Sequence, residues 1–531
     1  MSKRARRGYD MGGSLAVDAF GSSIAAGLEH DQAYGWASSP VDPNKLVRRF
    51  WKPLVARSRQ QSHSDSWVRG FERRVLDNVL GPKGSILRPL YMTDRVSISD
   101  DVERTREVPD GPLRKAITKW WTKQYSRKEA CHFREQLWLP EIKRAALQRC
   151  VRDGDLFIEH VFDDGPYGFR VQIIEPERCP VELNQGAIPA RSRVDVYVSM
   201  GIGYDQHMRP TAYYFRDKEG DVRLAGGTRL RRVPAERITH IYARDLGEDQ
   251  RRGLPWVTVA LLRAKMLAGL EDAAITKAKS AAEQGGFYEQ QGADGFIGDQ
   301  VDRDDNEVLI GRANEFQQVP TGFELHQIKS DWPRDWAAIE KWNLRAVASG
   351  WGIAYFFLAQ DYESINFSAG KLGILDEREM WCGLQEWWAR EMEVPHFEIA
   401  LGEALASTGI PGPNDQLLGP ADFELLRDVE FQGRRWPSVE PDKEWSANQR
   451  RVAMRETSVP ELIRARGRDP FEVAQEAAEW EELLAEFGLS MAVPDLSAQS
   501  SAVPEDDPEP TNEPGSEPTE DDDEDEYANE E

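Results

Sequence analysis

The residues GLPWVTVALLRAKMLAGLEDAAITKAKSAAE (253–283) form an amphipathic pattern typical of one long helix. Turn and strand signals follow at 284–330, and then a second helical pattern, DWPRDWAAIEKWNLRAVASG (331–350). A short apolar run leads into DYESINFSAGK (361–371). A small excursion held between two helices favours a ring-forming subunit over an enzyme, because nothing in it converges on a pocket.

The composition bounds the class of protein. With 531 residues, 40% of them hydrophobic and 30% charged, the chain is expected to fold into two or more domains. No run of about 18 apolar residues occurs, so no transmembrane helix is expected. The start, MSKRARRGYDMGGS, is basic but leads into small and polar residues, so we expect no signal peptide and assembly in a cytoplasm.

The negative charge is concentrated at one end. Residues 491–531 contain sixteen Asp and Glu and no Lys or Arg, so the other 490 residues carry only −9 of the net −25. The overall acidity therefore says little about the body. The four cysteines (Cys131, Cys150, Cys179, Cys382) lack CxxC spacing, which favours buried free thiols over a disulfide framework or a zinc site.

The organisation along the chain predicts an α+β protein. Helical patterns occupy Asn44 to about Pro89, including FERRVLDNVLG (71–81), and 113–152, where Pro140 breaks or restarts the helix. Short β-rich runs separated by turn signals predict a mostly antiparallel region, packed on these helices. The runs are DLFIEHVF (155–162), GFRVQIIEP (168–176), RVDVYVSMGIGYD (193–205), PTAYYFRD (210–217) and RITHIYA (237–243).

The second half alternates strands and helices before an acidic end. Strand-like segments recur in 286–330 (GGFYEQ, EVLIG, FELHQIK), and helices are expected at about 369–391 and 445–457. A last amphipathic stretch, DPFEVAQEAAEWEELLAEFGL (469–489), has an Asp-Pro start and a Gly488 stop. The acidic tail beyond it is expected to be disordered.

Four phrases in order resemble the lambda-type portal proteins of tailed bacteriophages. They cover roughly Leu147 to Leu483, and the ordered series is far more specific than any one of them. One departure is Asn366-Phe367-Ser368-Ala369-Gly370-Lys371, where the family pattern is Asn-Tyr-Ser-Ser-x-Arg. The phrases are LQRCVRDGDLFIEH (147–160), EDQRRGLPWVTVALLRAKMLAGLEDAAITKAKSAA (248–282), LRAVASGWGIAYFFLAQDYESINFSAGKLGILDERE (344–379) and WPSVEPDKEWSANQRRVAMRETSVPELIRARGRDPFEVAQEAAEWEEL (436–483).

The resemblance implies a multi-domain portal fold and a passive function. It implies a homo-oligomeric ring, of twelve subunits by family analogy, at one capsid vertex of the virion, assembled in the host cytoplasm. Double-stranded DNA would pass through its centre without sequence recognition. Terminase, head-completion proteins, the major capsid protein and a scaffold protein are the implied partners, and no cofactor, metal or membrane is implied.

The acidic tail would repel DNA or bind basic scaffold surfaces. The implied domains are a flexible arm (1–45), wing (46–250), stem helix (251–284), clip (285–330), second stem helix (331–350), tunnel-loop region (351–371), wing return (372–435), helical crown (436–490) and acidic tail (491–531).

Helix geometry singles out a cationic stripe on the second stem helix. At 100° per residue, Arg334, Lys341 and Arg345 fall within about 20° of one line. Trp336, Ile339 and Val347 lie on the opposite side and could pack on a neighbouring subunit. Such stripes around a ring would contact phosphates without reading bases. The alternative is a solvated helix face paired with Asp335 or Glu340.

The segment DYESINFSAGK carries the other candidate contacts. Its Ser, Asn and Gly residues predict a mobile loop. The resemblance implies that it projects into the channel, with Asn366, Ser368 and Lys371 nearest the DNA phosphates. The alternative is a surface loop in which Ser368 caps the following helix.

Two rival functions come from other classes. Asp153, Asp155, Glu159 and His160 could belong to a metal-dependent nuclease, since Asp155 and Glu159 would share one face of a strand. The chain contains no GxxxxGK[ST], HExxH or GxSxG motif, which disfavours catalysis and means that packaging would need a separate ATPase. The third possibility is a non-viral oligomeric scaffold protein.

Overall fold

The computed structural model describes residues 40–82, 84–99, 102–163, 165–185, 197–216, 230–283, 287–290, 323–326, 336–362 and 366–489. The chain divides into two units, 1–467 and 468–531, and each is described by itself. Arg334, residues 1–39 of the expected arm, most of the expected clip and the acidic tail lie outside the described residues.

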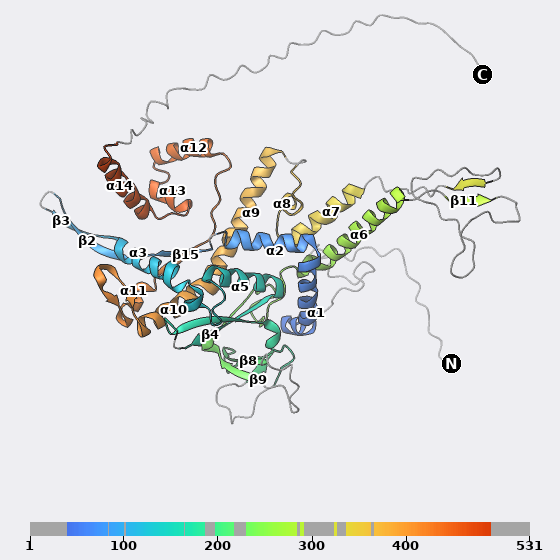
Figure 1. Ribbon diagram of the computed structural model, residues 1–531, viewed down its shortest axis with the longest axis horizontal. Helices are drawn as coiled ribbons and strands as arrows, with labels where there is room; N and C mark the ends of the chain where they lie inside the picture. Colours follow the sequence, from blue (N-terminus) through green and yellow to red (C-terminus); the bar gives the residue numbers. More distant parts are fainter. Residues whose placement is uncertain are drawn as a thin grey trace, which may run out of the picture. The chain divides into compact units, whose positions relative to one another are not determined.

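Helices and antiparallel sheets are mixed throughout the first unit (Figure 1), as the α+β prediction requires. Its α-helices are α1 (Pro43–Ser64), α2 (Ser66–Val79), α3 (Gly111–Lys119), α4 (Lys128–Cys131), α5 (Leu139–Asp153), α6 (Thr258–Glu283), α7 (Trp336–Gly350), α8 (Tyr355–Ala359), α9 (Phe367–Trp388), α10 (Val394–Ser407), α11 (Phe423–Leu426), α12 (Pro441–Ala453) and α13 (Val459–Ala465). Two π-helical segments, η3 (Trp120–Tyr125) and η6 (Ala389–Glu393), continue α3 and α9. Short 3-10 turns cover Pro176–Arg178, Ala235–Arg237, Pro413–Asp415 and Pro420–Asp422. The second unit contains α14 (Pro470–Glu486).

Every pair of named strands in the described residues is antiparallel. The two larger sheets have the orders β10-β4-β5 and β6-β7-β8-β9, and the others are strand pairs: β1-β15, β2-β3, β11-β12 and β13-β14. The strands are β1 (Ile86–Pro89), β2 (Met92–Ser99), β3 (Val102–Pro109), β4 (Asp155–Phe162), β5 (Phe169–Ile174), β6 (Tyr197–Ser199), β7 (Ile202–Tyr204), β8 (Pro210–Arg216), β9 (Leu230–Pro234), β10 (Ile238–Tyr242), β11 (Phe287–Gln290), β12 (Phe323–His326), β13 (Ile410–Pro411), β14 (Leu417–Leu418) and β15 (Val429–Gln432).

Strand β4 is buried on both faces, because successive side chains point to opposite sides of a sheet. Leu156 and Ile158 join the main core, which gathers residues of α2, α5, α6, α7, α9 and α10. Phe157 points the other way, into a second cluster with residues of the four-stranded sheet such as Phe215. The sheet β10-β4-β5 is therefore the layer that joins the helical part of the body to the smaller β part.

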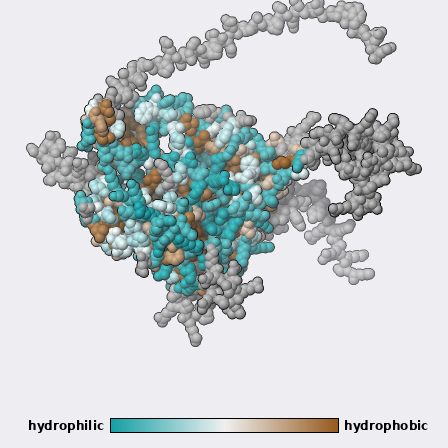
Figure 2. Space-filling view, viewed as in Figure 1, coloured by the Kyte–Doolittle hydropathy of each residue, from teal (hydrophilic) through white to brown (hydrophobic). Residues whose placement is uncertain are grey.

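Large aromatic residues fill much of this core. Trp120, Trp121, Trp351, Trp381 and Trp388 are buried, so core packing accounts for them. Other tryptophans are exposed, such as Trp138 and Trp342. On the face shown in Figure 2, hydrophilic residues cover most of the body and hydrophobic residues form only small groups.

The helix boundaries follow local capping signals. The Asp65 carboxylate accepts from the backbone N–H groups of Trp67 and Val68 at the start of α2, and Gly81 follows the helix with a φ of +73°. Pro140 lies in the first turn of α5, so it restarts the helix as expected. In the second unit Asp469 caps α14 and Gly488 follows it with a φ of +66°.

Some elements differ from the sequence prediction. Residues 86–89, expected to be helical, form β1, because they pair with β15, and Arg88 lies 342 residues from its partner Glu430. The β2-β3 hairpin and β9 were not predicted. The expected strand segments GGFYEQ (285–290) and FELHQIK (323–329) contain β11 and β12, while EVLIG lies outside the described residues.

Two further expectations concern thiols and membranes. Cys131, Cys150 and Cys179 are free and buried, as expected, whereas the free thiol of Cys382 is half-buried. Burial raises the pKa of the Cys131 thiol to about 12. No helix among the residues that the structure describes has the length and apolar character needed to cross a membrane.

Candidate functional site at helices α6 and α7

The two expected stem helices pack side by side (Figure 1). Helix α6 has 26 residues, or about 39 Å at 1.5 Å per residue. A Cβ added to Gly350 would lie 3.1 Å from the Cβ of Ala260, and the Arg263 guanidinium lies 5.9 Å from the ring of Trp342. The first contact joins the start of α6 to the end of α7. The second joins a residue further along α6 to a residue earlier in α7, so the two helices run antiparallel.

Helix α6 is apolar on two sides. Ala260, Leu261, Ala264 and Leu267 are buried in or against the body. On the other side Val259, Leu262, Met266 and Leu270 fall within about 80° of one another at 100° per residue. Their exposed fractions are 80%, 72%, 67% and 36%. We call these four residues the apolar stripe of α6.

A buried arginine fixes the base of α6 to the β part of the body. Arg252, six residues before the helix, is fully buried, and its Nε donates to Asp155 Oδ2 at 2.6 Å. Its other nitrogens donate to the backbone carbonyls of Pro176, Cys179 and Met200 at 3.0–3.2 Å. One side chain therefore joins three separate segments of the β part to the base of α6: Asp155 in β4, the turn at 176–179, and Met200 after β6.

The carboxylate of Asp155 also has several hydrogen-bond partners besides Arg252. Its carboxylate accepts from Trp51 Nε1 at 3.1 Å and from the backbone N–H of Gly253 at 2.7 Å, and lies 3.2 Å from His240 Nε2. Burial alone would raise the pKa of Asp155, but Arg252, His240 and the Gly253 N–H hold this pKa below its ordinary value. The carboxylate thus stays charged as the counter-ion of Arg252.

Two glycines allow the backbone before α6 to pass close to the end of α5. A Cβ on Gly253 would lie 2.0 Å from the carbonyl oxygen of Gly154 and 2.7 Å from the Cβ of Tyr242. Gly154, with a φ of +82°, ends α5, and a Cβ there would lie 2.2 Å from the carbonyl carbon of Leu254. Helix α6 starts at Thr258 rather than at Gly253, where the sequence pattern begins, and the backbone N–H of Trp256 donates instead to the Val151 carbonyl at 3.0 Å. We call Arg252, Asp155, Gly154 and Gly253 the stem junction.

The expected DNA contacts on α7 are engaged within the chain. Lys341 Nζ forms an ion pair with Asp361 Oδ2 at 2.9 Å, and Tyr355 donates its hydroxyl to the same oxygen at 3.0 Å. The cationic groups of Lys341 and Arg345 each lie 5.5 Å from the Tyr355 ring. Lys341 is therefore paired within the chain, with Asp361, which sequence reasoning missed.

The opposite face of α7 only partly matches its prediction. Val347 is fully buried and belongs to the core of its own chain, so it is not free to pack on a neighbouring subunit. Ile339 is 42% exposed. The side chain of Trp336 lies outside the described side chains.

The candidate contacts near α9 lie at its first turn. Helix α9 begins at Phe367, and the carbonyl of Asn366 accepts from the Gly370 N–H at 3.0 Å. The N-cap position is therefore Asn366 and not Ser368, and the expected loop ends earlier than predicted because these residues continue into the helix. Ser368 is exposed.

Lys371 makes a contact that the sequence did not predict. Its Nζ forms an ion pair with Glu440 Oε2, just before α12, and Lys443 Nζ lies 2.8 Å from the other Glu440 oxygen. Hydrogen bonds from Lys371 and Lys443 lower the pKa of Glu440 to about 2. The structure thus brings Lys341 and Arg345 together at Tyr355, whereas Lys371 pairs elsewhere.

The residues of the nuclease alternative take part in separate contacts. Asp153 accepts from Arg59 at 2.8 and 2.9 Å and from Arg149 at 2.9 Å. Glu159 pairs with both terminal nitrogens of Arg231, the longer contact at 2.8 Å. These carboxylates are neutralised by arginines and do not converge on a common point.

The histidine of that group is also engaged. His160 Nε2 lies 2.9 Å from the hydroxyl of Thr239, and burial lowers the pKa of His160 to about 4. In the described ranges, no group of three or more His, Cys, Asp and Glu side chains is placed to hold a metal ion. The geometry gives no support to a nuclease centre.

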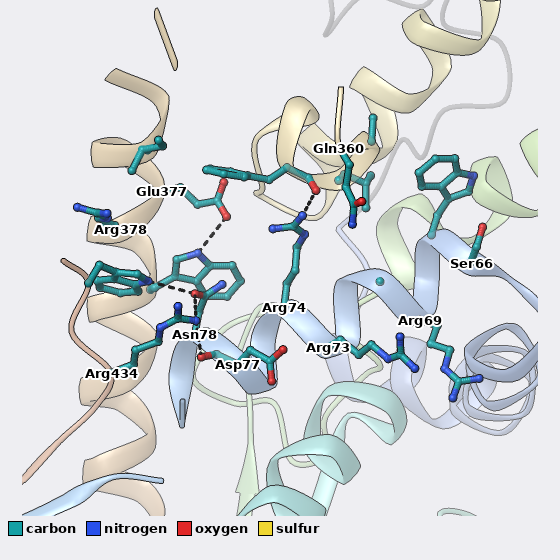
Figure 3. A pocket seen from close by; sticks show the side chains of 18 residues that line it. Ser66, Arg69, Arg73, Arg74, Asp77, Asn78, Gln360, Glu377, Arg378 and Arg434 are labelled. Carbon is teal, nitrogen blue, oxygen red and sulfur yellow. Dashed lines mark hydrogen bonds between the residues drawn. The ribbon is translucent and has the colours of Figure 1, made fainter. Parts of the chain in front are cut away.

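A cavity lined by arginines lies between α2, α8, α9 and residues 434–436 (Figure 3). It has a volume of about 1020 Å³. Sequence reasoning missed it, although WVRGFERRV (67–75) places arginines four residues apart on one helix face. The arginines that line it are Arg69, Arg73, Arg74, Arg378 and Arg434.

Comparison with known proteins identifies a protein family, a sequence relative and two solved structures that this chain resembles. The family described as "Phage portal protein, lambda family" matches residues 29–385. A "Probable portal protein" of Halomonas phage phiHAP-1 is 24% identical over 451 residues, which are 83% of this chain and 82% of the relative. Among solved structures, the "Neck of empty GTA particle computed with C6 symmetry" has 13% identity and a TM-score of 0.43, covering 83% of this chain and 98% of that one. The "Neck of native GTA particle computed with C12 symmetry" has 12% identity, a TM-score of 0.39 and the same coverage. With the family matched over most of its length, this chain belongs to the lambda family of phage portal proteins.

Proposed function

We propose that copies of this phage portal protein form a closed ring at one vertex of the capsid, with α6 and α7 in the wall of a central passage for double-stranded DNA. The portal family is structural rather than enzymatic, which agrees with a passive role. The observation that carries the ring is the apolar stripe of α6, which lies opposite the face of the helix that packs on the body.

The stripe favours a second copy of the chain as its partner. Burying each of these side chains is worth about 1.5–3 kcal/mol relative to leaving it in water. The body covers only one side of α6, so the exposed side needs another surface. A ring forms when such a contact is repeated around an axis until it closes. Twelve subunits remain the number that the family analogy suggests.

Replacing Leu262 and Met266 together with glutamate is expected to abolish ring assembly, because two charges would be placed in the proposed contact. The measurement is negative-stain electron microscopy together with native mass spectrometry. The matched control is Met208→Glu, since Met208 is also exposed, at 47%, but lies in the β7–β8 turn. Unchanged rings in the double variant would reject the stripe as a subunit contact.

The DNA contacts proposed for the passage are Arg334, Lys341, Arg345, Asn366, Ser368 and Lys371. Arg345 and Ser368 are exposed, and cations on a passage wall would meet phosphates without reading sequence. Asp361 offsets the charge of Lys341 in the isolated chain, so Arg345 carries more of the proposed attraction on α7.

Replacing Lys341 and Arg345 with glutamate is expected to leave ring assembly intact and to impair packaging or retention of DNA. The glutamate at 341 would also face Asp361, so a second variant, Lys341→Gln/Arg345→Gln, removes both charges without that repulsion. The measurement is the amount of nuclease-protected DNA per particle. The glutamine variant should be impaired as well, though less. If the glutamine variant packages DNA normally, a defect in the glutamate variant would come from repulsion by Asp361. Lys341 and Arg345 would then not be DNA contacts.

The remaining roles follow from the proposed ring. Residues 46–250 and 372–435 would form the wing, 251–284 and 331–350 the stem, 351–371 the tunnel-loop region, and 436–490 the crown. The clip at 285–330 would dock terminase during packaging and head-completion proteins afterwards. The major capsid protein and a scaffold protein would surround the ring in the virion.

A further inference from the structure

The arginine-lined cavity joins parts of the chain that are far apart in sequence. Helix α2 supplies Arg69, Arg73 and Arg74, α9 supplies Arg378, and Arg434 follows β15. In Figure 3 these side chains are spread along the cavity, with Arg378 and Arg434 at one end, Arg74 in the middle and Arg69 at the other end. The cavity is therefore a built feature of the folded body and not a gap along one helix.

The hydrogen bonds of these arginines leave their charges unbalanced. Arg74 donates to the carbonyl of Phe357. Arg378 donates to the carbonyl of Pro437 at 3.2 Å, and Arg434 donates to the carbonyl of Asp77 at 3.1 Å. Neutral acceptors satisfy the N–H groups but bring no negative charge. Within the described residues, Arg69 and Arg73 are exposed and form no ion pair.

The two carboxylates of the cavity, Asp77 and Glu377, compensate for only part of this charge. Asp77 pairs with Arg144, which lies outside the cavity lining, at 3.1 Å. Glu377 accepts from Trp381 Nε1 at 3.0 Å and from the backbone N–H of Ala354 at 3.2 Å. Burial raises the pKa of Glu377, and its electrostatic interaction with Arg74 acts in the opposite direction. Five arginines thus face two carboxylates, and this excess of positive charge favours an anionic ligand with several charges.

Aromatic walls and limited size narrow the class of ligand. The guanidinium groups of Arg378 and Arg74 lie 5.7 Å from the Trp436 ring and 5.4 Å from the Phe357 ring. Rings beside guanidinium groups suit a ligand that combines carboxylates with apolar or aromatic side chains. A rigid DNA duplex is too thick to enter a cavity of about 1020 Å³, whereas an extended peptide can enter it.

We propose that this cavity is a docking site for an acidic peptide segment of a partner protein. Carboxylates of the peptide would pair with the exposed Arg69 and Arg73, since guanidinium groups form bidentate contacts with carboxylates. An aromatic or aliphatic residue of the peptide would lie against Trp436 or Phe357. The site is complete within one chain, so this proposal does not rest on the ring or on the DNA passage.

The test is a titration of the full chain against a fluorescein-labelled peptide, EEDYEEDE, followed by fluorescence anisotropy. Saturable binding is expected, and the uncharged peptide QQNYQQNQ should not compete. The double variant Arg69→Ala/Arg73→Ala should raise the Kd about tenfold. The matched control is Arg48→Ala/Arg57→Ala, which removes two exposed arginines of α1 outside the cavity lining and should leave the Kd nearly unchanged.

A third variant separates occupation of the cavity from attraction to charge. Gly70 lines the cavity, and a Cβ added there meets nothing within 4 Å, so Gly70→Trp places an indole in the space without altering any charge. It should weaken peptide binding as strongly as loss of the arginines. Three results would each overturn the proposal. They are a peptide that does not bind the unaltered chain, an equal rise in Kd for both arginine double variants, and an unchanged Kd for Gly70→Trp. A short DNA duplex that binds through Arg69 and Arg73 while the peptide does not would assign the arginines to nucleic acid instead.

Discussion

Replacing Arg252 with methionine is expected to lower the free energy of unfolding of the body by about 3–5 kcal/mol, because the change strands the buried Asp155 carboxylate without its counter-ion. Methionine fills similar space but donates no hydrogen bond, so the carbonyls of Pro176, Cys179 and Met200 also lose a donor. The measurement is the urea unfolding midpoint, followed by tryptophan fluorescence.

The control for this variant lies one residue earlier. Arg251 donates to the hydroxyl of Tyr197 and stacks over aromatic rings, but Asp155 does not depend on it, so Arg251→Met should cost only about 1 kcal/mol. A double variant, Asp155→Asn/Arg252→Met, should recover part of the loss, since no charge is then stranded. Equal unfolding midpoints for Arg251→Met and Arg252→Met would show that the buried ion pair does not hold the stem junction.

Replacing Gly253 with alanine is expected to cost about 3 kcal/mol or more, since the new methyl group would overlap the carbonyl oxygen of Gly154 at 2.0 Å. The obstacle is backbone rather than the end of a flexible side chain, so it cannot move aside without shifting α5 or β4. The shift would also weaken the hydrogen bond from the Gly253 N–H to Asp155. Thermal unfolding and the yield of folded protein measure the effect.

A glycine in open space provides the comparison. Gly383 lies in α9, and a Cβ added there meets nothing within 4 Å. Gly383→Ala should therefore raise stability by about 0.5–1 kcal/mol, because alanine favours helix more than glycine does. If the two alanine variants were equally stable, the close approach of Gly154 and Gly253 would have no energetic importance.

Much of the fold could be predicted from local patterns. The run DLFIEHVF coincides with β4, and the Asp-Pro start and Gly488 stop enclose α14 as expected. These signals depend on residues a few positions apart, so the sequence displays them directly. Strand β1 could not be predicted in this way, since ILRP becomes a strand only by pairing with VEFQ at 429–432.

In the candidate site, too, local spacing could be predicted and contacts between distant residues could not. The spacing of Lys341 and Arg345 on one face of α7 was correct, but their environment depends on Tyr355 and Asp361, which the chain brings back after α7 has ended. The helix pattern marked Gly253 as its first residue, and Arg252 entered only within a phrase that resembles a family. Its physical reason, contact with Asp155 and Gly154 nearly a hundred residues earlier, becomes visible only in three dimensions.

The pairing of β1 with β15 also sets an order of events during synthesis. Arg88 leaves the ribosome 342 residues before Glu430, its partner across the two strands. At roughly 5–20 residues per second, residues 86–89 wait for their strand partner for about 17–70 seconds. During that time their backbone groups lack the hydrogen-bond partners that β15 later supplies. Folding of the body is therefore completed only after most of the polypeptide has been made.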